Sequence, residues 1–248
     1  MSRTQPIGPA TMETGISADL SPFLAPTPTI ESRHPDVTAL VKKHTAGARD
    51  VVEIAVRLYY AVRDGIRYDP YTCVLTVDGL KASQTLRAGR GWCVPKAILL
   101  ATCCRAAGIP ARLGYADVRN HLSTSRMRQN MQTEVFYWHG YTAMYLEGQW
   151  VKATPAFNIE LCRKFDLLPL EFDGRADSLF HSFDALGNRH MEYLNYRGEF
   201  ADTPIDAIIT TFSELYPDSM LVEGKAIGDG ADFDQDVDAE TKGAQRGG

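Results

Sequence analysis

Residues 91–104 read GWCVPKAILLATCC, an almost entirely apolar stretch that predicts a buried α-helix. Pro95 fits only in the first turn of a helix, so the helix is expected to begin at Trp92 or Cys93. Cys93 then lies at the positive end of the helix dipole. That position favours the thiolate form of cysteine, so the stretch predicts a nucleophile at the start of a buried helix.

His139 is the best candidate for a partner of this thiol, because it lies in a strand-like run 46 residues after Cys93. A histidine beside a cysteine can take the proton from the thiol and later return it to a leaving group. Trp138 and Tyr141 flank His139, and we expect either packing or substrate contacts from these two rings. The pair Cys93 and His139 therefore predicts nucleophilic catalysis.

The order of the elements indicates the fold class. Apolar residues at helical spacing predict helices over 36–44 and 50–64, ahead of the cysteine helix. Strands follow at 112–118 and in a hairpin that turns at Glu147-Gly148, whose arms are 134–147 and 149–153. The polar segment 120–132 is expected to be a loop, 180–183 and 191–196 to be short elements, and 204–215 to be a helix. A buried helix that packs on an antiparallel sheet predicts an α+β fold.

Composition predicts one domain. The chain has 248 residues, of which 44% are hydrophobic, enough for a sizeable core. We divide it into an extended arm (1–35), a core (36–158), the remainder of the same domain (159–222) and an acidic, disordered tail (223–248). The net charge is −5, and the tail carries most of it. The sequence contains no cluster of basic residues that would bind nucleic acid, so a nucleic-acid partner is not expected.

The sequence gives little indication of a membrane span, a secretory signal, a disulfide framework or a metal site. No run of 18 apolar residues predicts a membrane span, and the first 20 residues lack a secretory pattern. The five scattered cysteines are odd in number, so a reducing cytoplasm is expected. The acidic run from Asp232 fails the calcium-loop pattern at Val237 and Gly243, so neither a metal nor a cofactor is expected. The oligomeric state stays open.

Several motifs together resemble the transglutaminase-like superfamily over residues 36–158. They are IRYDP (66–70), RGWC (90–93), RAAGIPAR (105–112), WHGY (138–141) and GQW (148–150). The resemblance implies a papain-like fold with a Cys-His-Asp triad, in which Cys93 is the nucleophile and His139 the base.

The third triad position departs from the family pattern. The resemblance implies an aspartate followed by proline shortly after Trp150, and here the sequence reads Ala153-Thr154-Pro155. A threonine hydroxyl can accept one hydrogen bond from the imidazole but offers it no charge. Thr154 is the first candidate to orient His139, and Asn158 is the second. Asp166, Asp173 and Asp184 are further candidates.

Two donors besides the backbone are candidates for stabilising an oxyanion. The backbone N–H of Cys93 is the primary candidate, because the first N–H groups of a helix have no partner within it. The resemblance implies that Trp92 walls the site or lends its indole N–H. It also implies that an upstream glutamine, here Gln84, serves as a second donor.

These observations predict an enzyme that cleaves amide or peptide substrates through an acyl-thioester on Cys93, with hydrolysis slightly favoured. The first alternative is an acyltransferase of the transglutaminase type, in which an amine replaces water as acceptor. The second alternative is a non-catalytic binding module that retains the fold, and Thr154 is the residue that favours it.

Overall fold

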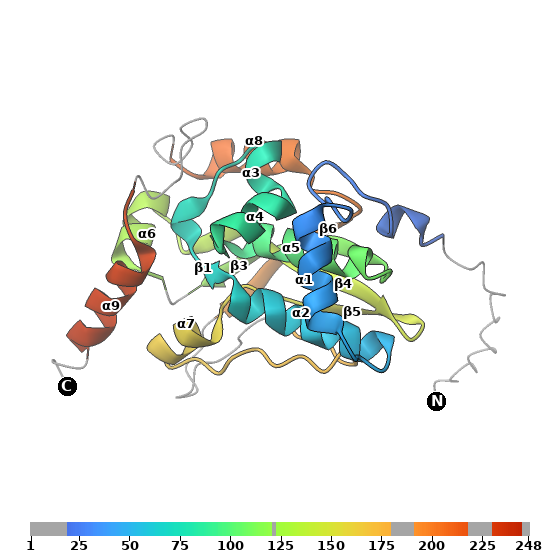
Figure 1. Ribbon diagram of the computed structural model, residues 1–248. Helices are drawn as coiled ribbons and strands as arrows, with labels where there is room; N and C mark the ends of the chain where they lie inside the picture. The colour runs from blue at the N-terminus through green and yellow to red at the C-terminus, as the bar shows by residue number, and fades with distance from the viewer. Residues whose placement is uncertain (1–18, 121–122, 180–190, 218–229, 245–248) are drawn as a thin grey trace, which may run out of the picture.

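The computed structural model describes residues 19–120, 123–179, 191–217 and 230–244, and helices pack around one antiparallel sheet of strand order β5-β4-β3-β6 (Figure 1). The strands of this sheet are β3 (Ala111–Asn120), β4 (Val135–Leu146), β5 (Gln149–Ala153) and β6 (Met191–Phe200). A separate parallel pair consists of β1 (Arg67–Tyr68) and β2 (Arg90–Gly91). The helices are α1 (Pro35–Thr45), α2 (Val51–Gly65), α3 (Val77–Leu80), α4 (Ala82–Ala88), α5 (Cys93–Ala106), α6 (Ser125–Met131), α7 (Ile159–Lys164), α8 (Ile205–Leu215) and α9 (Phe233–Ala244), with 3-10 turns η1 (Ser21–Phe23) and η2 (Pro70–Thr72).

The predicted α+β fold is confirmed, with the cysteine helix α5 packed on β4. Every residue of α5 from Cys93 to Arg105 is buried, as expected for a helix that is apolar on all sides. A Cβ atom on Gly140 of β4 would lie only 3.1 Å from the Cα of Val94, so glycine lets the helix start touch the strand. One turn later, the Thr142 hydroxyl donates a hydrogen bond to the Ala97 carbonyl at 2.8 Å. The sheet thus fixes the position of the N-terminus of α5.

The helix and hairpin predictions before residue 160 are confirmed in detail. α5 begins at Cys93 with Trp92 as its N-cap residue. The Asp50 carboxylate caps α2 by accepting the N–H of Glu53 at 2.8 Å. The β4–β5 hairpin turns at Glu147-Gly148, where both residues adopt positive φ, as two-residue hairpin turns require.

Segment 120–132 is not a loop throughout, because it contains helix α6. The Thr124 hydroxyl caps this helix by accepting the N–H of Met127 at 3.2 Å. Met127 and Met131 are spaced four residues apart, so they lie on one face of the helix, and both are buried. Two apolar residues on an otherwise polar segment leave too weak a pattern for a prediction from sequence.

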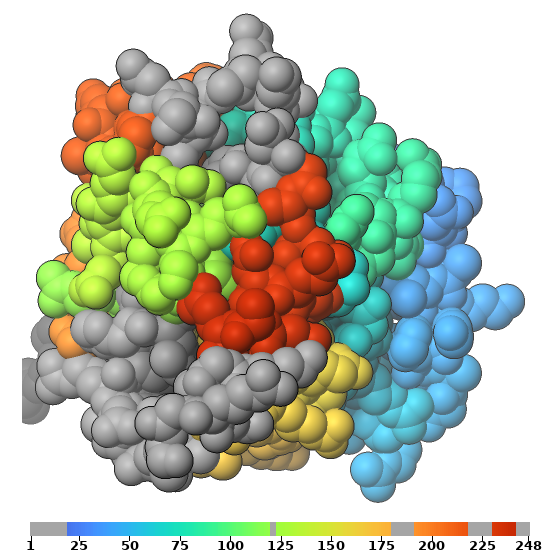
Figure 2. All heavy atoms as spheres, turned by 90° about the vertical axis from the view of Figure 1, so that its left-hand side faces the viewer, coloured from blue at the N-terminus to red at the C-terminus, as the bar shows by residue number. Residues whose placement is uncertain are grey.

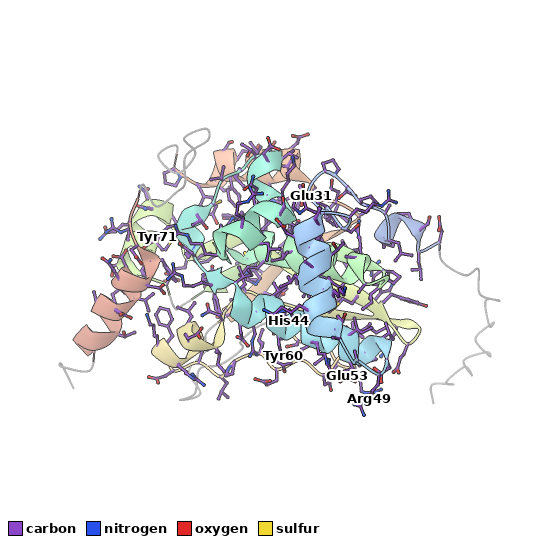
Figure 3. All side chains as sticks on the ribbon, viewed as in Figure 1. Glu31, His44, Arg49, Glu53, Tyr60 and Tyr71 are labelled. Carbon is purple, nitrogen blue, oxygen red and sulfur yellow. The ribbon has the colours of Figure 1, made fainter. Side chains whose placement is uncertain are left out.

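The acidic tail is not disordered over its described part, because residues 233–244 form helix α9. Phe233 and Val237 lie one turn apart and are buried against the body. The acids that suggested a solvated tail instead pair with bases on other elements: Arg67–Asp234 at 2.7 Å, Arg126–Asp236 at 2.7 Å and Lys164–Asp238 at 2.6 Å. Asp236 also accepts the hydroxyl of Tyr71 at 2.6 Å. Tyr71 is labelled in Figure 3, near α9. The helix lies between α6 and α7 on the face shown in Figure 2.

The remaining predictions fall partly outside the described residues. The helix expected over 204–215 is α8, and the element expected over 191–196 is the longer strand β6. The segment 180–183 and the first 18 residues of the arm lie outside the described residues. Within the described arm, the ring of Phe23 packs edge-on against Trp150 with centroids 5.3 Å apart. None of the helices in the described ranges has the length and apolarity needed to cross a membrane.

Lys96 anchors α5 to the end of α2. Its side chain is fully buried, and Nζ donates hydrogen bonds to the carbonyls of Arg63, at 2.9 Å, and Ile66. Burial lowers the pKa of this amine from 10.5 to about 7, since the charged form loses its hydration. The amine therefore carries a charge less readily in the folded chain than in the unfolded one.

We expect Lys96→Met to change how stability depends on pH. Between pH 7 and 10.5 the unfolded lysine still binds a proton that the folded one has lost, so the wild type becomes more stable as pH rises. Relative to Lys96→Met, its free energy of unfolding should rise by up to about 5 kcal/mol across that window. Urea unfolding of both proteins at pH 7, 8.5 and 10 measures this. A difference that stays constant with pH contradicts the expectation.

Candidate active site

Cys93 lies at the junction of α5 and β4 and is 5% exposed. Burial raises the pKa of its thiol to about 11. The backbone N–H groups of Gly140, Val94 and Cys93 itself act on the sulfur in the opposite direction and lower this pKa. Burial outweighs the helix start, so at neutral pH the isolated group is a thiol rather than the thiolate that its helix position predicts.

The other cysteines are less suited to ionise. All five are free and buried. Burial raises the pKa of Cys103 to about 12, and it raises the pKa values of Cys73 and Cys104 still further above the ordinary range of a thiol. Cys162 has a pKa of about 11, like Cys93, but it is fully buried. Among the five cysteines, Cys93 thus combines one of the two lowest thiol pKa values with a side chain that is partly open to solvent.

An apolar cavity opens beside the Cys93 thiol, and we call it the thiol cavity. Trp92, which was predicted to wall the site, forms part of the wall of this cavity. Side chains from six parts of the chain line the cavity: Tyr68, Pro70, Cys73, Trp92, Cys93, Met127, Met131, Phe136, Tyr137, Phe212 and Tyr216. The thiol is thus reached through a nonpolar environment.

His139 follows a distortion in strand β4. Ala116 of β3 pairs with His139, and Val118 pairs with Phe136, so two residues of β4 lie opposite Asp117. This is a β-bulge, a device that redirects side chains near functional sites. Trp138 within it has a φ of 57°, a left-handed conformation that is rare for a large side chain. The bulge therefore sets the direction of the residue that follows, His139.

Asp117 holds this bulge in place, and sequence reasoning did not identify it. Its carboxylate accepts the backbone N–H of Trp138 at 3.2 Å and is paired with Arg197 of β6, whose Nε lies 2.9 Å from both carboxylate oxygens. Asp117 is buried. The sequence contains one signal that points to it, an acid within the otherwise apolar strand 113–118.

His139 and Thr154 are brought together, whereas the cavity that they line is distinct from the thiol cavity. Both side chains are buried and border a small cavity together with Phe157. The ring of Phe157 packs on Tyr68 of the thiol cavity with centroids 4.8 Å apart. The backbone connects the two places most directly, since Gly140, whose N–H acts on the Cys93 sulfur, is the residue after His139.

The predicted hydrogen bond from His139 to Thr154 is not formed. Within the described part of the chain, the buried Thr154 Oγ1 has no hydrogen-bond partner. The backbone of Thr154 is held firmly, because its N–H donates to the Ser178 carbonyl at 2.9 Å and its carbonyl accepts the Tyr59 hydroxyl at 3.3 Å. Thr154 therefore occupies the expected place beside His139 without the expected contact.

Asn158, Asp166 and Asp173 do not take the place of Thr154 as the hydrogen-bond partner expected for His139. The Asn158 amide is used on both sides, since Oδ1 accepts the Tyr68 N–H at 3.0 Å and Nδ2 donates to Glu160 at 2.7 Å. The Asp173 carboxylate accepts N–H groups of its own turn, and Asp166 is exposed. Asp184 lies outside the described residues.

Three other candidate residues lie away from the thiol cavity. Gln84 is exposed on α4, accepts a hydrogen bond from Arg87 at 3.2 Å and does not line the thiol cavity, so its role as an oxyanion donor stays a prediction. Trp138 packs on Tyr115, with centroids 5.5 Å apart. The Tyr141 ring lies over Gly114 and its hydroxyl donates to Glu199 at 2.9 Å. Trp138 and Tyr141 thus both make packing contacts in the structure.

Within the described ranges, no cluster of histidine, cysteine, aspartate or glutamate side chains could hold a metal ion. The described residues place a candidate nucleophile in the wall of a nonpolar cavity, and a histidine next to a bulge in the wall of a separate one. The chemistry available to this set is nucleophilic attack by sulfur with proton transfer through an imidazole.

Two solved structures are similar to parts of this chain. A protein from Cytophaga hutchinsonii, solved as a candidate cysteine protease, is 21% identical, with a TM-score of 0.43 over 56% of this chain and 43% of that one. A candidate protease from Parabacteroides distasonis is 16% identical, with a TM-score of 0.36 over 54% of this chain and 24% of that one. The chain thus spans less than half the length of either structure, and no curated protein matches it.

The comparison with protein families covers the segment that holds both candidate catalytic residues. Residues 38–155 match the family model described as the transglutaminase-like superfamily. This segment runs from α1 through the cysteine helix to the end of the β4–β5 hairpin. The position of Cys93 at a helix start agrees with this match, and residues 38–155 are thus similar to the transglutaminase-like superfamily.

Proposed function

We propose that this protein is a cysteine enzyme that hydrolyses amide or peptide bonds through an acyl-thioester on Cys93. One observation carries the proposal: a buried thiol at a helix start receives backbone N–H groups, one of them from the residue next to His139. The match of residues 38–155 to the superfamily supports a cysteine-type enzyme in general. Water as the acyl acceptor and a reducing cytoplasm as the location are part of the proposal.

The raised pKa of Cys93 shapes the proposed mechanism. Because the resting group is a thiol, His139 takes its proton while the sulfur attacks the carbonyl carbon, rather than beforehand. The new S–C bond leaves a negative charge on the carbonyl oxygen, which the Cys93 N–H at the helix start can stabilise. Collapse breaks the C–N bond, and His139 gives the proton to the leaving amine. Water, deprotonated by His139, then cleaves the thioester and restores the thiol.

Alkylation by iodoacetamide tests whether Cys93 is the reactive thiol. We expect Cys93 to react at least tenfold faster than the other four cysteines, measured by peptide mass spectrometry. With a pKa of about 11, only about one thiol in 10⁴ is ionised at pH 7, so the rate should rise about tenfold per pH unit up to pH 10. Equal labelling of all five cysteines contradicts the proposal. A rate that is already level at pH 7 contradicts the neutral resting thiol.

Thr154→Asp tests whether the third triad position limits the activity. A carboxylate beside His139 orients the imidazole and stabilises its cation, so we expect kcat/KM on a peptide amide to rise at least about tenfold. The buried carboxylate should also cost about 1–3 kcal/mol of stability, measured by urea unfolding. Thr154→Val is the matched control, since it keeps the shape without the hydroxyl. If neither wild type nor Thr154→Asp turns over any amide or thioester, the binding-module alternative replaces the proposal.

A further inference from the structure

We infer that the substrate acyl group carries a nonpolar substituent, which binds in the thiol cavity while the carbonyl carbon is attached to Cys93. The inference rests on the proposed function, because it assigns a place to the acyl group that the thiol takes up. Cys93 is itself part of the cavity wall. A substituent one or two bonds from the thioester carbon therefore enters this cavity directly.

The chemistry of the wall selects nonpolar groups. The described lining contains no charged side chain. The hydroxyl of Tyr216 donates to the Val135 carbonyl at 3.1 Å and accepts the Tyr137 N–H at 3.0 Å, so its polar atom is already used. A charged or amide-bearing substituent would lose its hydration in this cavity and gain few hydrogen bonds in return. The wall therefore favours aliphatic or aromatic groups over polar ones.

The cavity is small, and its adaptable wall decides which groups can enter. The space open to a water-sized sphere is only about 40 Å³, so a substituent larger than a methyl group requires the wall to move. Two methionines of α6, Met127 and Met131, form part of the wall, and their flexible thioether chains can adjust to differently shaped nonpolar groups. We therefore expect the cavity to accept a short chain or a single ring when Met127 and Met131 move aside.

A second cavity marks how far a longer substituent could extend. It shares Tyr68, Pro70, Met127 and Phe136 with the thiol cavity. Phe233 of α9 lines its other side and packs on Tyr68 with centroids 5.8 Å apart. A substituent that passes the shared residues would therefore reach this second cavity.

N-substituted iodoacetamides test the inference without requiring a known substrate. In each case the Cys93 sulfur displaces iodide, forming an S–C bond and breaking the C–I bond, and the thiol proton passes to His139 or buffer. We compare the alkylation rate constants of Cys93 with N-hexyl iodoacetamide and with iodoacetamide, each divided by its rate with free cysteine. Burial of a methylene group is worth about a fourfold gain, so the normalised ratio should exceed ten.

Two opposite changes at Met131 show whether the thiol cavity causes this preference. Met131→Trp should fill the cavity and lower the hexyl ratio at least fivefold, whereas Met131→Ala should widen it and raise the relative rate of the bulkier N-benzyl reagent. Leu168→Trp is the control, because Leu168 is 66% exposed and lines neither cavity. This control should leave the hexyl ratio unchanged.

The possible failures are distinguishable. If iodoacetamide labels Cys93 but the hexyl ratio stays near one, the nonpolar subsite is wrong and the proposed function stands. A ratio above ten that both Met131 variants leave unchanged places the nonpolar group elsewhere and also overturns the subsite. If neither reagent labels Cys93, the proposed function fails and the subsite fails with it.

Discussion

Cys93→Ala is expected to abolish amide hydrolysis, with kcat/KM falling at least about 10⁴-fold. The variant removes the only atom that can form the proposed acyl-thioester, and catalysis then depends on substrate binding and backbone donors alone. Steady-state hydrolysis of a peptide amide with a nonpolar acyl substituent, followed with wild type and variant at equal concentration, measures the loss.

Cys103→Ala provides the matched control for that loss. Cys103 lies in the same helix and is fully buried, so its replacement leaves a similar small gap in the core. It should lower stability moderately and leave kcat/KM within about threefold of wild type. Equal activity of wild type and Cys93→Ala would remove the basis of the proposed mechanism.

His139→Asn is expected to lower kcat by about 10²–10⁴-fold with a smaller effect on KM. An asparagine amide cannot take the thiol proton during attack, so the contribution of general acid–base catalysis is lost. Rate measurements at several substrate concentrations separate kcat from KM. Because Cys93 is a thiol at rest, its alkylation rate above pH 10 should be nearly the same in His139→Asn and wild type.

His34→Asn serves as the control for the histidine replacement. His34 caps α1, where its Nδ1 accepts the N–H of Asp36 at 3.2 Å, and it lies outside the candidate site. An asparagine side chain can serve the same capping role, so kcat should stay within about twofold of wild type. Full turnover by His139→Asn would show that another group moves the proton.

Local signals predicted the parts of this fold whose cause lies within a few residues. Pro95 located the start of α5, Asp50 located the start of α2, and Glu147-Gly148 located the hairpin turn, because these residues restrict or satisfy the backbone directly. The apolar sequence of α5 likewise required burial on all sides. The candidate nucleophile and base were identified from these elements and the family motifs.

Helices α6 and α9 show where local signals were insufficient. Each depends on a single pair of buried residues four positions apart, Met127 with Met131 and Phe233 with Val237. The acids of α9 are neutralised by bases from distant elements, among them Arg67 and Arg126. From sequence alone, a run of acidic residues that forms a packed helix looks the same as a solvated tail, because the distant basic partners are not known.

The amino-acid sequence by itself determined the α+β order of elements, the helix that begins at Cys93 and the strand that carries His139. Only the tertiary structure decided the protonation of the thiol, the bulge that Asp117 holds before His139, and the nonpolar cavity beside the sulfur. The reason is physical: the helix start acts on Cys93 within one turn, whereas burial depends on residues from β1, α6, β4 and α8. Desolvation is the larger effect here, and it exists only once those segments have packed together.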